Sequence, residues 1–337
     1  MLKNFSKDRC YIIAEIGGNF TTFEEAKHLV DLAYESGVDA VKLQTYKADT
    51  LVTKTAKFDL DNVGEMLQYE LFEKYQIDFS LHKKIFEYIE SKNLDWFSTP
   101  AHQTDVDMLD TLNVPAHKIG ADDATNIPLL KKVAITNKPL LLSSGMCTLE
   151  ETKEMVNTCL ELGNDQIILF HTISNYPTYP EQVNLNVLNT LKKEFPSLII
   201  GFSDHTIGTT ASIAAACMGA HVIEKHFTHD KNAEGPDHQL SANPVEMKKI
   251  VDTIREFELM RGTATKRPVG KEITNRAKNR KSIVSLRAIK KGEEFTLENI
   301  DIKRPGYGIE SKYFEHVLGK KATKDIENDT VLTNSDV

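Results

Sequence analysis

Two histidines end short apolar segments of the sequence, where their side chains could act together on one ligand. His205 closely follows one such segment and His226 ends the next one along the chain. If the two segments are neighbouring parallel strands, about 4.8 Å apart, both imidazoles can converge on a single ion. Two imidazoles with carboxylates nearby suit a divalent cation that also binds water and substrate. Two hydrogen-bonded histidines inside a fold would produce the same pattern.

Two lysines lie within short apolar segments and are candidates for binding an anion. Lys42 stands in Ala-Val-Lys-Leu and Lys118 in His-Lys-Ile. Burying a lysine in such a segment is costly unless the ammonium group faces a polar cavity and an anionic partner. The hydroxyl groups of Thr99 and Ser143 could complete a phosphate cradle.

Other interpretations of the two lysines stay open at this point. Each could pair with an internal carboxylate such as Glu15 or Glu224. A lysine that forms a Schiff base in an aldolase would also show this pattern.

The elements that position these side chains form a repeated unit of one strand and one helix. Such alternation predicts a parallel sheet, and eight units over about 260 residues predict an α/β fold of the (β/α)8 TIM-barrel type. An open doubly wound sheet is less favoured, because Gly17-Gly18-Asn19 after the first strand is not a GxGxxG turn. The predicted strands are Tyr11–Ile16, Ala40–Gln44, Leu94–Ser98, Ala116–Ile119, Pro139–Ser143, Gln166–His171, Leu198–Phe202 and His221–His226. The predicted helices are Phe23–Ser36, Leu81–Lys92, Thr104–Leu112, Leu149–Leu162 and Thr210–Met218.

A barrel of this type carries its active site at the carboxyl ends of the strands, and those ends are polar here. Because side chains alternate along a strand, Glu224 and His226 share one face while Lys225 points the other way. The polar strand ends comprise Glu15, Lys42, Gln44, Ser98, Thr99, Lys118, Ser143, Ser144, His171, Ser174, Tyr176, Asp204, His205, Glu224 and His226.

The barrel is predicted to occupy residues 1–262. A long insertion, Tyr46–Tyr75, interrupts it after the second strand, with a helical piece at Val63–Lys74. We interpret it as a binding lid or as a decoration of the fold. Residues 263–281 are basic and irregular and are predicted to be a linker. Residues 282–337 form a small second domain, whose core alone would be marginal.

The composition limits the classes of function. The chain has 337 residues, of which 40% are hydrophobic and 27% charged, as in ordinary globular proteins. No apolar segment reaches the roughly 18 residues of a membrane helix, and the first eight residues are not those of a secretory signal. A net charge of −8 disfavours nucleic acid as a partner. Four scattered cysteines suit reduced thiols, so we expect a cytoplasmic protein.

An ordered set of motifs resembles the N-acetylneuraminate (sialic acid) synthase family, which condenses phosphoenolpyruvate with an N-acetylated hexose. The C-terminal part resembles the antifreeze-like SAF domain, a β-clip fold, of that family. The barrel motifs are Ala14-Glu15-Ile16-Gly17, Val41-Lys42-Leu43-Gln44-Thr45, Ser98-Thr99-Pro100, Lys118-Ile119-Gly120, Ser143-Ser144-Gly145-Met146, Tyr176-Pro177-Thr178, Ser203-Asp204-His205, Glu224-Lys225-His226-Phe227 and Gly235-Pro236-Asp237. The C-terminal motifs include Lys290-Lys291-Gly292-Glu293, Lys303-Arg304-Pro305-Gly306 and Leu318-Gly319-Lys320.

The resemblance implies a role for each matching residue. His205 and His226 would bind a divalent ion, most often Mn²⁺, with Mg²⁺ and Co²⁺ as alternatives. Glu224 would orient water or the aldehyde. Arg304 would reach the barrel of a partner subunit in a domain-swapped homodimer and recognise the N-acetyl group. The phosphoenolpyruvate ligands would be Lys42, Thr99, Lys118 and Ser143, and the open-chain amino sugar would contact Glu15, Gln44, Tyr176 and Asp237.

Several positions depart from the family pattern and bear on the choice of sugar. Ala121 stands where a serine is usual, Ser174 where an asparagine is usual, and Phe20 follows Asn19 in place of histidine. The Gly-Pro-Asp-His run at 235–238 is more similar to the neuraminate and legionaminate branches than to the pseudaminate branch. The acceptor would then be ManNAc or a 2,4-diacetamido-trideoxyhexose.

Two other enzymes fit the same barrel. One is a lysine-dependent pyruvate aldolase. The other is a 3-deoxy-ulosonate synthase acting on a sugar phosphate, for which Lys47, Lys54 and Lys57 are the available basic residues near the insertion. A catalytically silent sugar-binding protein is disfavoured by the complete set of polar strand ends.

Overall fold

In the computed structural model, which describes residues 2–60 and 64–337, eight parallel strands close into a barrel, as the sequence predicts. All eight predicted strands are present, with ends that differ from the predicted ones by at most two residues. Neighbours around the ring follow the order β1-β10-β9-β8-β7-β6-β5-β2. The strands are β1 Tyr11–Glu15, β2 Ala40–Thr45, β5 Asp95–Pro100, β6 His117–Ile119, β7 Leu140–Ser143, β8 Ile167–Thr172, β9 Ile199–Asp204 and β10 Val222–His226.

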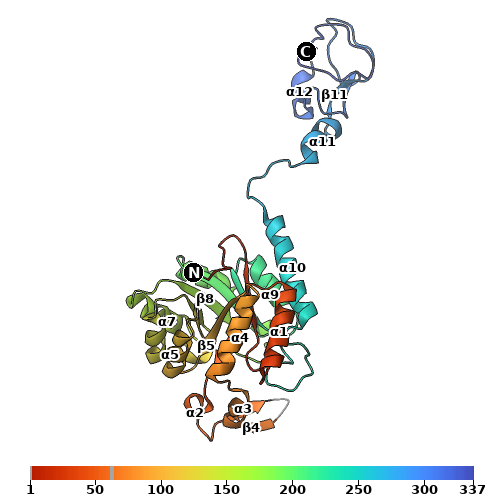
Figure 1. Cartoon of the computed structure of the whole chain (residues 1–337). Helices are drawn as coiled ribbons and strands as arrows, with labels where there is room; N and C mark the ends of the chain where they lie inside the picture. The colour runs from red at the N-terminus through yellow and green to blue at the C-terminus, as the bar shows by residue number, and fades with distance from the viewer. Residues whose placement is uncertain (1, 61–63) are drawn as a thin grey trace. The chain divides into compact units, whose positions relative to one another are not determined.

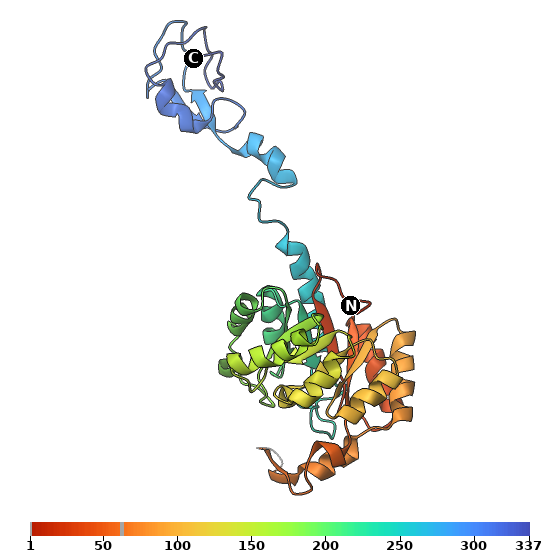
Figure 2. The same ribbon diagram turned by 90° about the vertical axis from the view of Figure 1, so that its left-hand side faces the viewer.

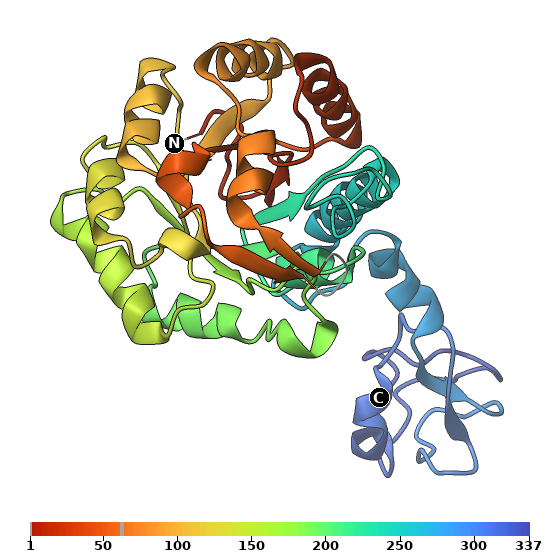
Figure 3. The same cartoon turned by 90° about the horizontal axis from the view of Figure 1, so that it is seen from below.

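Helices surround the barrel, which Figure 3 shows from one end. Helix α1 illustrates why they form where they do: Thr22 and Glu25 make a capping box at its start, and Gly37 ends it in the left-handed conformation at φ 84°. The helices of the ring are α1 Phe23–Ser36, α4 Phe79–Ser91, α5 Gln103–Thr111, α6 Ile127–Ala134, α7 Leu149–Glu161, α8 Val187–Glu194, α9 Thr210–Cys217 and α10 Pro244–Arg261, with short 3-10 turns at Ala121–Asp123 and Pro180–Gln182. The five helices predicted from sequence are all among them.

The interior of the barrel is an apolar plug that ends in polar side chains. Alternate residues of each strand point inward, so the plug continues directly into the next inward positions. Ile13 is followed in this way by Glu15, and Phe97 by Thr99. The inward apolar residues include Tyr11, Ile13, Ala40, Phe97, Ala116, Leu141, Ile168, Phe170 and Val222.

The insertion after β2 lies beyond one end of the barrel (Figures 1 and 2). It contains helix α2 Ala48–Leu51, an antiparallel pair β3 Lys57–Leu60 and β4 Gly64–Leu67, and helix α3 Gln68–Tyr75. The predicted helical piece Val63–Lys74 is confirmed only from Gln68 onward. It is wrong for Gly64–Leu67, which pair as a strand, and Val63 lies outside the described residues.

The chain divides into two compact units, Met1–Gly262 and Thr263–Val337. The second unit contains α11 Lys271–Asn279, an antiparallel pair β11 Ser282–Ser285 and β12 Ile300–Lys303, a 3-10 turn at Ser311–Tyr313 and α12 Phe314–Val317. Its own apolar core includes Ile283, Phe295 and Ile300. The prediction that residues 263–281 are irregular is wrong for the nine residues of α11. Within the described part of the chain, no helix combines the length and apolar character needed to cross a membrane.

Candidate active site

The two predicted anion-binding lysines meet the same carboxylate at the carboxyl ends of the barrel strands. Lys118 Nζ lies 3.4 Å and Lys42 Nζ 3.8 Å from Oε1 of Glu224. Glu15, at the end of β1, forms a second ion pair with Lys42. All four side chains are buried, with at most 5% of any of them exposed. The interpretation that the lysines pair with internal carboxylates therefore describes this arrangement.

Each ammonium group also contacts one of the two hydroxyl groups that were predicted to complete a phosphate cradle. Lys42 Nζ donates to Thr99 Oγ1 at 2.9 Å, and Lys118 Nζ donates to Ser143 Oγ at 2.6 Å. The four residues come from four different strands, β2, β5, β6 and β7, which are consecutive in the ring. They form a row of two cations and two hydroxyls, which is a donor set suited to an anion with several oxygens.

The buried charges shift one another's pKa. Burial acts to raise the pKa of Glu224, but Lys118 and Lys42 outweigh it and lower that pKa to about 2. Burial likewise acts to lower the pKa of Lys42, and Glu15 with Glu224 raises it above its ordinary value. For Lys118 burial prevails, so its pKa is lowered. Oε2 of Glu224 is buried and has no hydrogen-bond partner among the described residues, although Ser203 Oγ donates to Oε1 at 3.1 Å.

The two predicted metal-binding histidines lie side by side on neighbouring strands. The ring centroids of His205 and His226 are 5.4 Å apart. His205 Nδ1 lies 2.7 Å from the carbonyl oxygen of Ile173, and a carbonyl only accepts, so this nitrogen carries a proton. His226 Nδ1 lies 3.2 Å from Oδ2 of Asp237. The ring of Tyr176 covers His205, with 4.2 Å between the centroids.

The environment gives the two imidazoles different proton affinities. Burial, together with the nearby His226, lowers the pKa of His205 to about 4. Burial acts to lower the pKa of His226 as well, but Asp237 outweighs it and raises that pKa above its ordinary value. The carboxyl group of Asp237 has a lowered pKa in return, despite its burial, because His226 faces it.

The pair of imidazoles fits a divalent ion that takes its other ligands from water and substrate. No group of three or more His, Cys, Asp or Glu side chains is placed to hold a metal ion within residues 2–60 and 64–337. His205 is oriented through Nδ1 by a backbone carbonyl, which is how metal-binding histidines are usually held, and this leaves Nε2 for a ligand. Nδ1 of His226 faces Oδ2 of Asp237, so a carboxylate holds this second ring.

The predicted sugar-contacting residues gather beside this pair. A Cβ atom at Gly17 would lie 2.6 Å from Cγ of Gln44 and 2.6 Å from Oε1 of Glu15, so only glycine fits between them. A Cβ atom at Gly18 would lie 3.4 Å from Oδ2 of Asp237. The turn after β1 therefore brings Glu15, Gln44 and Asp237 close together.

Two of the positions that depart from the family pattern meet at Gly145. A Cβ atom there would lie 2.5 Å from Ser174 Oγ and 2.8 Å from the Cβ of Ala121. The hydroxyl of Ser174 is buried and has no hydrogen-bond partner among the described residues. Phe20, by contrast, is 4% exposed and packs in the core between strands and helices.

One carboxylate near this site, that of Asp122, was not predicted to have a role. It contributes to the raised pKa of Lys42, and its Oδ1 lies close to the point where a Cβ atom at Gly120 would be. The next residue, Asp123, instead accepts a hydrogen bond from Asn126 at 2.7 Å. The position of Asp122 soon after the end of β6 could have indicated a role, because barrel enzymes carry functional groups there.

Other polar strand ends point away from the site. His171 Nε2 bonds to the carbonyl oxygen of Val183 at 2.8 Å, and Asp204 pairs with Lys225 at 2.9 Å. Arg304 belongs to the second unit, directly follows β12 and is exposed. Its contact with a partner subunit stays a prediction.

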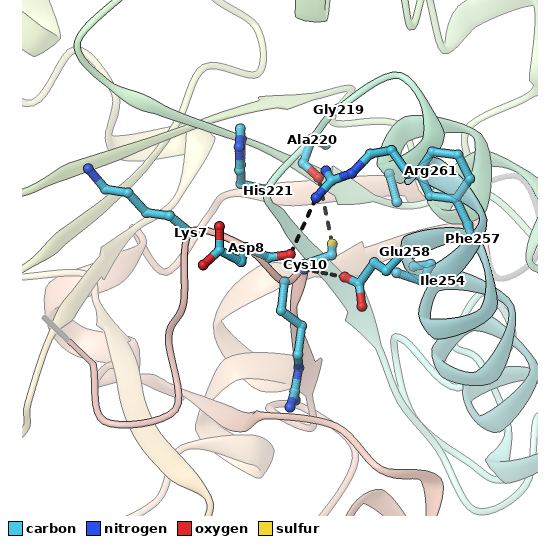
Figure 4. Close-up of a pocket in the computed structure, with 12 residues that line it drawn as sticks. Lys7, Asp8, Cys10, Gly219, Ala220, His221, Ile254, Phe257, Glu258 and Arg261 are labelled. Atoms are coloured by element: carbon cyan, nitrogen blue, oxygen red, sulfur yellow. Dashed lines mark hydrogen bonds between the residues drawn. The ribbon is translucent and has the colours of Figure 1, made fainter. Parts of the chain in front are cut away.

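A pocket at the other end of the barrel is separate from these groups (Figure 4). Its walls come from segments that precede β1 and β10 and from helix α10, including Cys10, His221 and Glu258. The backbone amide of Cys10 donates to the carboxylate of Glu258, so two polar groups of the pocket wall already bond to each other.

Comparison with known proteins agrees with the resemblance drawn from the motifs. The family model of the NeuB family matches residues 29–266, and the family model of the SAF domain matches residues 280–337. An N,N'-diacetyllegionaminic acid synthase of Legionella pneumophila is 39% identical over 332 residues, which cover 96% of this chain and 93% of the relative. A pseudaminic acid synthase of Campylobacter jejuni is 34% identical, with 99% and 98% covered. The crystal structure of an N-acetylneuraminic acid (sialic acid) synthetase from Leptospira borgpetersenii, in complex with citrate, has a TM-score of 0.71 at 27% identity, with 80% of this chain and 91% of that chain covered.

Proposed function

We propose, from the premise that this chain belongs to the NeuB family, that it is a nonulosonic acid synthase acting on phosphoenolpyruvate and an open-chain N-acetylated hexose. The observation that carries the proposal is the convergence of Lys42 and Lys118 on Glu224 from different sides of one barrel end. The imidazoles of His205 and His226 stand at the same end.

Phosphoenolpyruvate carries a phosphate and a carboxylate, and the row of cations and hydroxyls offers a binding place for each. Lys42 with Thr99 and Lys118 with Ser143 would bind these two groups. Fixed cations in a buried site stabilise such charges far better than mobile water does, because they need no reorganisation. Holding both ends of the molecule also fixes its C3 carbon in an attacking geometry.

The sugar would lie on the side of Glu15, Gln44, Tyr176 and Asp237. His205 and His226 would hold a divalent ion, for which we propose Mn²⁺, and this ion would polarise the aldehyde of the sugar as a Lewis acid. Asp237 would orient His226 and bind a hydroxyl group of the sugar.

The reaction that this arrangement supports forms one carbon–carbon bond and releases phosphate. C3 of phosphoenolpyruvate attacks the aldehyde carbon, whose oxygen takes up a proton. Water, oriented by Glu224, adds to C2 and gives a tetrahedral centre. The bond between C2 and the bridging oxygen then breaks, phosphate leaves with that oxygen, and the oxygen of the added water remains in the product.

For the acceptor we propose a 2,4-diacetamido-trideoxyhexose of the legionaminate type or ManNAc. The legionaminic acid synthase relative is 39% identical to this chain and the pseudaminic acid synthase relative 34%. We also propose a homodimer in which Arg304 of one subunit reaches the N-acetyl group bound in the other.

A pyruvate aldolase is a second candidate, because burial lowers the pKa of Lys118 and a less basic lysine is the form that makes a Schiff base. Borohydride added with pyruvate would trap such an adduct as a mass increase on Lys118. The synthase forms no adduct.

The proposal is tested by incubating the protein with phosphoenolpyruvate, Mn²⁺ and one sugar from a panel. The panel contains ManNAc, 2,4-diacetamido-trideoxyhexoses and hexose phosphates, the last to test for a 3-deoxy-ulosonate synthase. Phosphate release that depends on one unphosphorylated N-acetylated sugar, with a product whose mass equals that of the sugar plus pyruvic acid, supports the proposal. Phosphate release with a sugar phosphate alone contradicts it.

A further inference from the structure

An ion pair lies directly behind the two imidazoles, on the outer side of strands β9 and β10. Lys225 Nζ is 2.9 Å from Oδ2 of Asp204, and the two side chains are 1% and 0% exposed. Asp204 precedes His205 in the chain, and Lys225 precedes His226. The two residues are also paired across the strand ladder, so the ion pair ties the strands together one residue before each histidine.

The same groups fix the backbone on both sides of His205. The carboxylate of Asp204 accepts hydrogen bonds from the amide of Thr206 at 2.8 Å and from Ser212 Oγ of helix α9 at 2.5 Å. Lys225 Nζ donates to the carbonyl oxygen of Thr206 at 2.7 Å. The residues before and after His205 are therefore held by one buried network.

This network continues to the loop that carries Tyr176. The amide of Thr178 donates to the carbonyl oxygen of His205 at 3.0 Å, and Thr178 forms a parallel bridge with Thr206. The ring of Tyr176, two residues before Thr178, covers the imidazole of His205. A shift of Thr206 would therefore move both the imidazole and the tyrosine above it.

We propose that Lys225 is a positioning residue that sets the distance between the two imidazoles through Asp204 and Thr206, and so sets their affinity for a divalent ion. The inference rests on the proposed function, because it takes His205 and His226 as ligands of that ion. It extends that function to residues that touch neither ion nor substrate. A purely structural ion pair would add stability and leave the affinity for the ion unchanged.

The test measures Mn²⁺ affinity of the purified full-length chain by electron paramagnetic resonance titration, without substrates. Lys225→Met keeps the length of the side chain and removes its hydrogen-bond donors. Loss of an outer-shell partner typically weakens metal binding by about 10- to 100-fold, so we expect at least a 10-fold loss. The urea midpoint of each variant is measured in parallel.

A matched control lies at the opposite end of the same barrel. Arg255 Nη2 is 2.9 Å from Oδ2 of Asp39, whose side chain is 3% exposed and which directly precedes β2. Arg255→Met therefore also removes a cation from a buried aspartate, which keeps a second ion pair with Arg9. We expect it to lower the urea midpoint and to change Mn²⁺ affinity by less than about 2-fold, as for a site outside the network.

Equal Mn²⁺ affinities of Lys225→Met and the wild type would overturn the inference while leaving the proposed function intact. Failure of the wild type itself to bind Mn²⁺ would refute the metal part of the proposed function first, and this inference with it. If Lys225→Met does not fold, Ser212→Ala replaces it, because it removes only one hydrogen bond to Asp204. An affinity loss of about 3-fold or more in Ser212→Ala then supports the inference, and an unchanged affinity overturns it.

Discussion

Lys118 Nζ lies 3.4 Å from Glu224 Oε1, although the two residues stand on strands β6 and β10, which are on opposite sides of the ring. The ion pair therefore spans the barrel above its apolar plug. Lys42 reaches the same oxygen from β2, so one carboxylate joins three parts of the barrel. The predictions below follow from this junction and from the groups around it.

Glu224→Gln should remove a pH-dependent part of the stability. The pKa of Glu224 is lowered to about 2 in the folded protein from an ordinary value of 4.5, so its contribution is present above pH 4.5 and is lost as the pH falls toward 2. Measured by urea unfolding, the stability difference between wild type and variant should shrink by about 2 kcal/mol between about pH 5 and about pH 3. A difference that stays constant over this range would contradict the ionised Glu224 described here.

His226→Ala should fold and lose turnover that depends on the divalent ion. The imidazole is one of only two nitrogen ligands that we propose, so we expect a loss of at least about 100-fold in kcat/KM. Activity is measured with Mn²⁺ added back to chelator-treated protein. His171→Ala serves as the control, since that buried imidazole bonds to the carbonyl oxygen of Val183 away from the site. Equal activity of His226→Ala and the wild type after this treatment would refute the metal role.

Much of this arrangement could be predicted from the sequence, because the period of two along each strand assigns an inward or outward direction to every strand-end residue. This period correctly predicted that Glu224 points into the barrel and Lys225 to its outer side. Glu224 was named as a possible partner of either lysine. That both lysines contact the same oxygen of Glu224 could not be predicted, since it depends on which strands face one another across the ring. Gly64–Leu67 were mistaken for helix because the signal for their strand is the pairing with Lys57–Leu60, which is not local.

Ser174→Ala should stabilise the protein and weaken substrate binding. The hydroxyl is buried without a partner among the described residues, so its removal should add about 1 kcal/mol to the free energy of unfolding. If the hydroxyl binds substrate, the same change should raise a substrate KM by about 5-fold or more.

Ser36→Ala is the control, because the Ser36 hydroxyl is buried but donates to the carbonyl oxygen of Leu32 at 2.8 Å, far from the site. It should lower stability and leave both KM values unchanged. A stabilised Ser174→Ala with wild-type KM values would exclude Ser174 from substrate binding.

Arg304→Ala should raise the KM for the sugar by about 10-fold or more and change that for phosphoenolpyruvate by less than about 2-fold, as expected when a charged hydrogen bond to one substrate is lost. Arg287→Ala is the matched control, because Arg287 is an exposed arginine of the same unit that pairs with Glu293 at 2.7 Å. Steady-state kinetics with each substrate varied in turn distinguish the two effects. An equal increase in both KM values would count against recognition of the N-acetyl group by Arg304.

The most direct test of the central claim follows the bridging oxygen of phosphoenolpyruvate. The substrate is labelled with ¹⁸O between C2 and phosphorus and is incubated with the protein, Mn²⁺ and the sugar that releases phosphate. Condensation through a tetrahedral centre at C2 predicts that all of the label leaves in inorganic phosphate, with unlabelled oxygen at C2 of the product. Label retained in the product, or phosphate release without a condensed product, would contradict the account.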